Sequence, residues 1–214
     1  GLYDQSVLLE QSFGLNSGWQ DARGACGGAS AIKDFYAPPT DGLPAPERQF
    51  LSGIDESLFA KRVVLFDTGI SRAATRGLNE VLDAYLTRDP HRYPAIRESL
   101  DIHNRMVHAL QQESYNQLGK LSARYWQLRC ILDPGATSKE LQHLFDHPSV
   151  ADLSEGGLIT GAGGGGFALL IAREGRENEL RQALTALHKM TPYAKSSVVS
   201  YSLNQTGISL SERP

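Results

Sequence analysis

Cysteine is scarce in this sequence. Its 214 residues contain two, Cys26 and Cys130, and their wide separation excludes a CxxC metal or redox pair. Free thiols of this kind are typical of a reducing cytoplasm. Long apolar runs are also missing, because no stretch approaches the ~20 residues of a membrane-spanning helix, and no signal peptide is visible. We therefore expect a cytoplasmic protein that does not cross a membrane.

An excess of positive charge is absent too. The 21 lysines and arginines are outnumbered by 24 aspartates and glutamates, which leaves a net charge of −3. A nucleic-acid-binding protein would carry a basic stripe, so that class is excluded. The six histidines show no metal-site spacing, and we interpret them as structural or surface residues. An initiator methionine is also missing, which a fragment or a processed chain would explain.

Glycine, by contrast, is concentrated in one place. Five of the six positions at 161–166 are glycine, between the apolar segments Leu158-Ile159 and Phe167–Ile171. A flexible linker has polar flanks, whereas these flanks predict two buried strands. We interpret the run as a tight loop whose backbone N–H groups can face an anion or a polar ligand. A glycine bulge or a close crossing of strands, without a ligand, is the alternative.

Hydrophobic periodicity predicts an α+β chain in two parts, residues 1–60 and 61–214. The first part contains a helix at 2–13, a glycine-flanked loop around Asp21 and a Pro-rich stretch at 37–46. The second part is expected to contain a strand at 62–69, helices at 71–88, 94–117, 119–132, 139–147 and 176–190, the glycine-rich strand pair, and a strand at 196–203. Thr137 or Ser138 is expected to cap the helix at 139–147.

Asp21 is the best catalytic candidate among the polar residues. A carboxylate in a glycine-flanked loop can orient or deprotonate a hydroxyl, although a turn-capping role is the commoner one for aspartate. Glu10 can hold a cation near it, or be an exposed helix residue. Arg72 can bind an anion or a substrate hydroxyl, and Arg23 can keep Asp21 ionised; both can equally lie in solvent.

Several segments occur in an order that is known from one family. They are Leu9-Glu10-Gln11, Gly18-Trp19-Gln20-Asp21, Ala31-Ile32-Lys33, Asp67-Thr68-Gly69-Ile70-Ser71-Arg72, Tyr125-Trp126 before Pro134-Gly135, and the glycine-rich run. Together they resemble the GHMP small-molecule kinases, which include galactokinases and mevalonate kinases, and within them the L-fucose kinase branch. The resemblance implies a two-lobed α+β fold, with an incomplete N-terminal lobe at 1–60 and a ferredoxin-like C-terminal lobe with extra helices at 61–214.

The resemblance also implies an activity, the Mg²⁺-dependent transfer of the ATP γ-phosphate to a hydroxyl of an L-fucose-like sugar, with a sugar 1-phosphate as product. The alternatives are another GHMP kinase, acting on a heptose phosphate or galactose, and a non-catalytic kinase module that binds a sugar or a protein. The implied roles are catalytic for Asp21, metal-binding for Glu10, substrate-binding for Trp19, Gln20, Arg72, Gly163 and Gly164, and ATP-binding for Gly161, Ala162, Gly163, Gly164 and Gly165.

The sequence departs from the family pattern at two points. The main phosphate loop of the family, Pro-x-x-x-Gly-Leu-Gly-Ser-Ser-Ala, is absent and would lie about where the chain starts. We therefore expect a C-terminal portion that is inactive alone and is completed by an N-terminal half or by self-association. The usual Gln-Asp-Gln-Val-Gly-Gly is here Gln20-Asp21-Ala22-Arg23-Gly24-Ala25, so the preferred sugar can differ from L-fucose.

Overall fold

The computed structural model describes residues 9, 12, 30–33, 47–51, 53–70, 77–161 and 163–204. The chain divides into two compact units, one made of Gly1–Ile54 and Ser202–Pro214 and the other of Asp55–Tyr201. Helix α3 (Glu56–Arg62), which the sequence pattern did not indicate, runs directly into strand β3 (Val63–Asp67). The division between 60 and 61 expected from the sequence therefore lies inside α3, which belongs to the larger unit.

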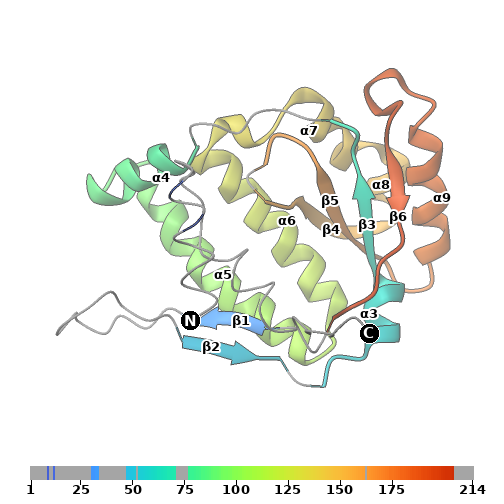
Figure 1. Ribbon diagram of the computed structural model, residues 1–214, viewed down its shortest axis with the longest axis horizontal. Helices are drawn as coiled ribbons and strands as arrows, with labels where there is room; N and C mark the ends of the chain where they lie inside the picture. Colours follow the sequence, from blue (N-terminus) through green and yellow to red (C-terminus); the bar gives the residue numbers. More distant parts are fainter. Residues whose placement is uncertain are drawn as a thin grey trace, which may run out of the picture. The chain divides into compact units, whose positions relative to one another are not determined.

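The smaller unit contains an antiparallel pair of strands, β1 (Ser30–Lys33) and β2 (Glu47–Phe50), drawn in blue in Figure 1. The sequence pattern did not indicate these short strands, which flank the Pro-rich stretch. Leu9 and Ser12 are helical, as predicted for 2–13. The other residues of that predicted helix lie outside the described part of the chain.

The larger unit is built on a four-stranded antiparallel sheet in the order β4-β5-β3-β6, with β4 (Ser154–Ile159), β5 (Phe167–Ala172) and β6 (Ser197–Val199). Along the chain, β3 is followed by helices, the β4–β5 hairpin, one further helix and β6 (Figure 1). This order of strands and helices is the ferredoxin-like arrangement. The α+β, ferredoxin-like expectation for this part of the chain is confirmed.

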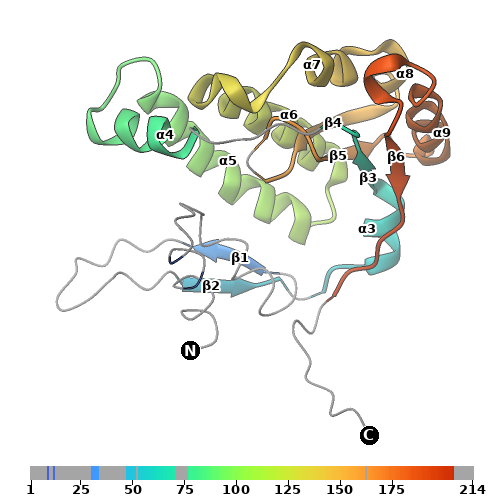
Figure 2. The ribbon, with the colours of Figure 1, turned by 45° about the horizontal axis from the view of Figure 1, so that its top comes forward.

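Helices cover both faces of this sheet. Between β3 and β4 lie α4 (Gly77–Leu86), α5 (Tyr93–Gln111), α6 (Tyr115–Leu132), the 3₁₀ turn η1 (Pro134–Ala136), α7 (Lys139–Asp146) and α8 (Pro148–Ala151). Between β5 and β6 lie α9 (Glu177–Leu187) and η2 (Thr191–Tyr193). Figure 2 shows α5 and α6 on one side of the sheet and α8 and α9 on the other. None of the helices in the described residues is long and apolar enough to cross a membrane.

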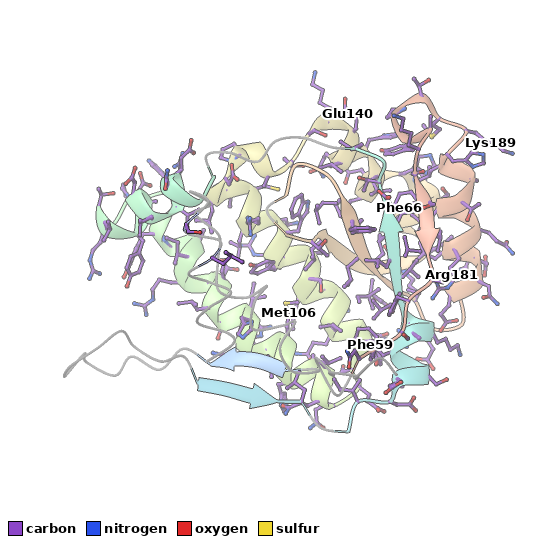
Figure 3. All side chains as sticks on the ribbon, in the orientation of Figure 1. Phe59, Phe66, Met106, Glu140, Arg181 and Lys189 are labelled. Atoms are coloured by element: carbon purple, nitrogen blue, oxygen red, sulfur yellow. The ribbon has the colours of Figure 1, made fainter. Side chains whose placement is uncertain are left out.

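The side chains of β3 alternate between the two helical layers, as expected for a strand that is buried on both faces. Val63 packs in a cluster with residues of α5 and α6. Val64 and Phe66, the latter labelled in Figure 3, pack in a second cluster with residues of α7, α8 and α9. The sheet is therefore the middle layer of three, and the continuous apolar run of β3 follows from its position there.

The single helix predicted over 94–117 is wrong at its C-terminal end. The chain leaves α5 after Gln111, takes a positive φ of 53° at Glu113, and enters α6 at Tyr115. The apolar pattern continues through this turn because Tyr115 is buried in the same cluster as Ile102 of α5. The other predicted helices of this unit are confirmed where the structure describes them, with ends that shift by a few residues.

Helix α6 and strand β4 contact each other through glycines, one on each element. A Cβ added to Gly119 would lie 2.4 Å from the Glu155 Cβ, and a Cβ added to Gly156 would lie 2.3 Å from the Gly119 carbonyl oxygen. A bulge between Ser154 and Gly156 accompanies this contact. Because no side chain separates the two backbones, the position of α6 on the sheet is tightly fixed, and so is the start of η1 that follows it.

Cys130 lies on α6 and packs against the core cluster on the α7–α9 side of the sheet. Among the described residues it is a free cysteine, and burial raises the pKa of its thiol. A thiol whose pKa is raised is a poor nucleophile at neutral pH. This agrees with the interpretation of Cys130 as a free thiol; Cys26 lies outside the described residues.

Replacing Ser138 by alanine is expected to destabilise the protein by about 1 kcal/mol. The Ser138 side chain accepts a hydrogen bond from the Leu141 N–H, 3.2 Å away, and caps α7. Ser114 precedes α6 in the same position but makes no capping hydrogen bond, so Ser114→Ala is the matched control. Urea unfolding of both variants measures the difference, and equal midpoints would show that the cap of α7 contributes nothing.

Candidate functional site

The segment 160–167, called here the glycine loop, joins β4 to β5. Its base is closed by a hydrogen bond of 2.8 Å from the Thr160 N–H to the Phe167 carbonyl oxygen. Gly161, Gly163, Gly164, Gly165 and Gly166 all have positive φ angles, between +66° and +146°. Residues with a Cβ rarely adopt this conformation. The backbone path therefore requires the glycines, and the segment is a folded loop instead of a linker.

One side of the glycine loop is held by residues 68–70, which follow β3. The Thr68 N–H donates to the Gly166 carbonyl oxygen at 2.9 Å, and the Gly166 N–H donates to the Ile70 carbonyl oxygen at 2.8 Å. A Cβ added to Gly165 would lie 2.1 Å from that Ile70 oxygen. A side chain at 165 would therefore push the loop away from residues 68–70.

The other side of the glycine loop is held by η1. The Gly164 N–H donates to the Ala136 carbonyl oxygen, and a Cβ added to Gly163 would lie 2.7 Å from the Ala136 Cβ. The turn is itself fixed by the Asp133 carboxylate, which accepts a hydrogen bond of 2.9 Å from the Gly135 N–H. Backbone from two distant parts of the chain thus encloses the loop.

These contacts decide which amide groups remain for a ligand. The N–H groups of Gly164 and Gly166 donate within the protein and are not available to an anion. Within the described residues, the N–H groups of Gly163 and Gly165 have no acceptor. The loop is also open at Gly161, where an added Cβ would meet nothing within 4 Å. A rigid loop with an open side and unpaired amides fits a phosphate group.

The described residues also include side chains that could hold a cation where several lie together. In the part of the chain that the structure describes, no group of three or more His, Cys, Asp and Glu side chains is placed to hold a metal ion. Glu10, the predicted Mg²⁺ ligand, lies outside that part. The metal ligand therefore remains a prediction from the sequence.

The structure brings together part of the predicted site. Gly161, Gly163, Gly164 and Gly165 lie in one loop. Five other predicted residues, together with Ala162 of the loop itself, lie outside the described residues, and their roles stay predictions. These five are Glu10, Trp19, Gln20, Asp21 and Arg72.

Thr68, Ile70 and Ala136 contact the glycine loop and were not among the predicted site residues. Two sequence signals lie next to them, the Thr68-Gly69 pair after an apolar strand and Pro134-Gly135 after a helix. Each signal predicts a turn. Neither predicts that both turns pack on the same loop, because that proximity is created by the sheet order.

No protein-family model matches the chain, but two curated proteins do. The chain is 30% identical over 183 residues to a bifunctional fucokinase/GDP-fucose pyrophosphorylase from Arabidopsis thaliana, covering 83% of this chain and 17% of the relative. It is 23% identical over 213 residues to an L-fucokinase/L-fucose-1-P guanylyltransferase from Bacteroides fragilis, covering 97% of this chain and 21% of the relative. The chain thus spans about a fifth of the length of these relatives.

Solved structures of several small-molecule kinases have a similar fold. The mevalonate kinase from L. major in complex with R-mevalonate gives a TM-score of 0.65 at 18% identity, over 93% of this chain and 56% of that chain. The galactokinase from Lactococcus lactis complexed with galactose gives 0.59 at 18% identity, over 92% and 56%. A putative sugar kinase from Campylobacter jejuni gives 0.58 at 21% identity, over 96% and 55%. With the ferredoxin-like unit and its glycine loop, these similarities show that the chain has the fold of these kinases and that two fucokinases are among its sequence relatives.

Proposed function

We propose that the protein is an ATP-dependent sugar kinase that phosphorylates L-fucose or a closely related sugar. The observation that carries this proposal is the 30% identity over 183 residues to the bifunctional fucokinase from Arabidopsis thaliana. The Bacteroides fragilis relative is named for the same sugar and for L-fucose-1-P. The second name supports a sugar 1-phosphate as the product of the proposed reaction.

The proposed chemistry assigns distinct tasks to two carboxylates. Phosphoryl transfer depends on positioning and on the stabilisation of charge. Asp21 would accept the proton of the attacking sugar hydroxyl, as a positioned general base does. Glu10 would bind Mg²⁺, which prefers oxygen ligands and typically needs only one or two carboxylates besides the nucleotide phosphates. The metal, when bound, neutralises charge on the phosphates.

The glycine loop is proposed to position the nucleotide and part of the acceptor. Its open side at Gly161 and the unpaired amides of Gly163 and Gly165 support contacts with the ATP phosphates. Gly163 and Gly164 are also proposed to bind the sugar, and so are Trp19, Gln20 and Arg72. The two-sided support of the loop favours this role, because a fixed loop needs no reorganisation when charge develops on the transferred group.

Two alternative substrates arise within the same family, galactose and a heptose phosphate. The likeness to a galactokinase is one of fold alone, at 18% identity, whereas the sequence relatives are fucokinases. The unusual Ala22-Arg23 pair after Asp21 is the feature that favours a changed sugar. A protein that binds the sugar without phosphorylating it is the alternative from another functional class.

Incubating the full-length protein with ATP, Mg²⁺ and a panel of sugars is expected to release ADP with L-fucose as the preferred acceptor. The panel contains L-fucose, galactose, a heptose phosphate and a sugar-free control, and mass spectrometry identifies the product. If the protein prefers another sugar of the panel, that sugar replaces L-fucose as the proposed substrate. Sugar binding by calorimetry without any ADP release would support the non-catalytic alternative and contradict a kinase.

A further inference from the structure

We infer that Thr68 is a positioning residue, whose hydroxyl holds the glycine loop in the conformation that phosphoryl transfer requires. The effect on phosphoryl transfer rests on the proposed function, whereas the inference that the hydroxyl holds the loop rests only on the contacts of Thr68. Thr68 follows the last residue of β3 and is completely buried. No role of its own is implied for it by the family resemblance.

The Thr68 hydroxyl makes two hydrogen bonds with different partners. It donates to the Gly166 carbonyl oxygen at 2.7 Å and accepts from the Ile70 N–H at 3.2 Å. The backbone adds the bond from the Thr68 N–H to the same Gly166 oxygen and the bond from the Gly166 N–H to the Ile70 oxygen. Thr68, Ile70 and Gly166 therefore form a closed cycle of four hydrogen bonds, of which the hydroxyl makes two.

Removing this hydroxyl would change the position of the glycine loop more than the stability of the protein. The Gly166 carbonyl oxygen keeps the Thr68 N–H as a donor at 2.9 Å, so no buried acceptor is left unpaired there. Only the Ile70 N–H loses its partner. The cycle then rests on two backbone bonds, and the loop can move relative to residues 68–70 without unfolding the sheet.

The cycle joins the glycine loop, proposed for ATP and for part of the sugar site, to residues 68–70. Arg72, proposed for the sugar, comes two positions after Ile70 in the sequence. A misplacement of about 1 Å in such a site lowers the rate by roughly 10²-fold. A buried hydroxyl that ties the two together thus has a direct route to the reaction rate.

The test compares Thr68→Val, which keeps the shape of the side chain, with Thr68→Ser, which keeps the hydroxyl, in the full-length protein. Thr68→Val is expected to lower kcat by about 10- to 100-fold while the midpoint of thermal unfolding falls by roughly 5 °C or less. Thr68→Ser is expected to keep kcat near the wild-type value. Thr185→Val is the matched control, because the exposed Thr185 hydroxyl also donates to a carbonyl oxygen, that of Arg181, at 2.8 Å.

Hydrogen exchange supplies a readout that does not depend on activity. The Gly166 amide is expected to exchange at least about 10-fold faster in Thr68→Val than in wild type or Thr68→Ser, while the Leu170 amide in β5 stays unchanged. If the wild-type protein phosphorylates no sugar, the proposed function fails and this exchange comparison alone decides whether the hydroxyl holds the loop. The inference is overturned if the Gly166 amide of Thr68→Val exchanges at the wild-type rate. It is also overturned if Thr68→Ser loses as much kcat as Thr68→Val.

Discussion

Replacing Asp21 by asparagine is expected to lower kcat for the proposed sugar phosphorylation by about 10³-fold, within the range of ~10²–10⁴ that a positioned general base contributes. Asparagine has nearly the same shape and can still hydrogen-bond to the sugar hydroxyl, but its amide accepts no proton. The KM for the sugar therefore changes little while kcat falls. Steady-state ADP release by the full-length protein, at saturating ATP and over a range of sugar concentrations, measures both constants.

The matched control for this variant is Asp152→Asn. Asp152 is exposed and follows α8, so the same loss of a carboxylate there leaves kcat at the wild-type value. If Asp21→Asn retains kcat within about threefold, Asp21 contributes less than general bases do. The catalytic assignment would then fail, although the sugar could still bind beside Asp21.

Replacing Gly156 by alanine is expected to destabilise the protein by about 3 kcal/mol or more, through an overpacked contact added to backbone strain. The new Cβ would lie 2.3 Å from the Gly119 carbonyl oxygen and 2.8 Å from the Ala123 Cβ, and the φ angle of Gly156 is +141°. Relief requires α6 to move away from β4. The midpoint of thermal unfolding is expected to fall by roughly 10 °C.

Gly175→Ala separates the two causes of this loss. Gly175 also has a positive φ, +76°, but an added Cβ there would meet nothing within 4 Å. Replacing Gly175 by alanine is therefore expected to lower the free energy of unfolding through backbone strain alone, by about 1 to 2 kcal/mol. Equal losses at the two positions would show that backbone strain dominates and that the close contact of α6 with β4 is unimportant for stability.

The parts of the fold that could be predicted are those with a strong local signal. The apolar run of β3 and the amphipathic pattern of α9 are examples, and both elements are present where expected. The break between α5 and α6 was missed because Glu113 takes its positive φ in the C-cap of α5, where its N–H donates to the Leu110 carbonyl oxygen. Glycine is usual at that position, and glutamate carries no turn signal. Strands β1 and β2 have four residues each, too few to show a period of two.

The candidate site was predictable to a similar degree. The density of glycine indicated the folded loop, because few other reasons place so many glycines between buried strands. The contacts that fix the loop were not predictable, since Thr68 and Ala136 reach it only through the order of the strands and the course of α6. Of the amides that we expected to face an anion or a polar ligand, those of Gly164 and Gly166 donate within the protein instead.

The double support of the glycine loop has a consequence for how the protein folds. The Thr68 hydroxyl and the Gly166 carbonyl oxygen that it binds are 98 residues apart in the sequence. Contacts of such long sequence separation carry a large loop-closure entropy and form slowly. The β4–β5 hairpin can pair early, but its loop acquires its final shape only after β3 has joined the sheet and η1 has docked. The conformation of the glycine loop is thus expected to be among the last features of this unit to form during folding.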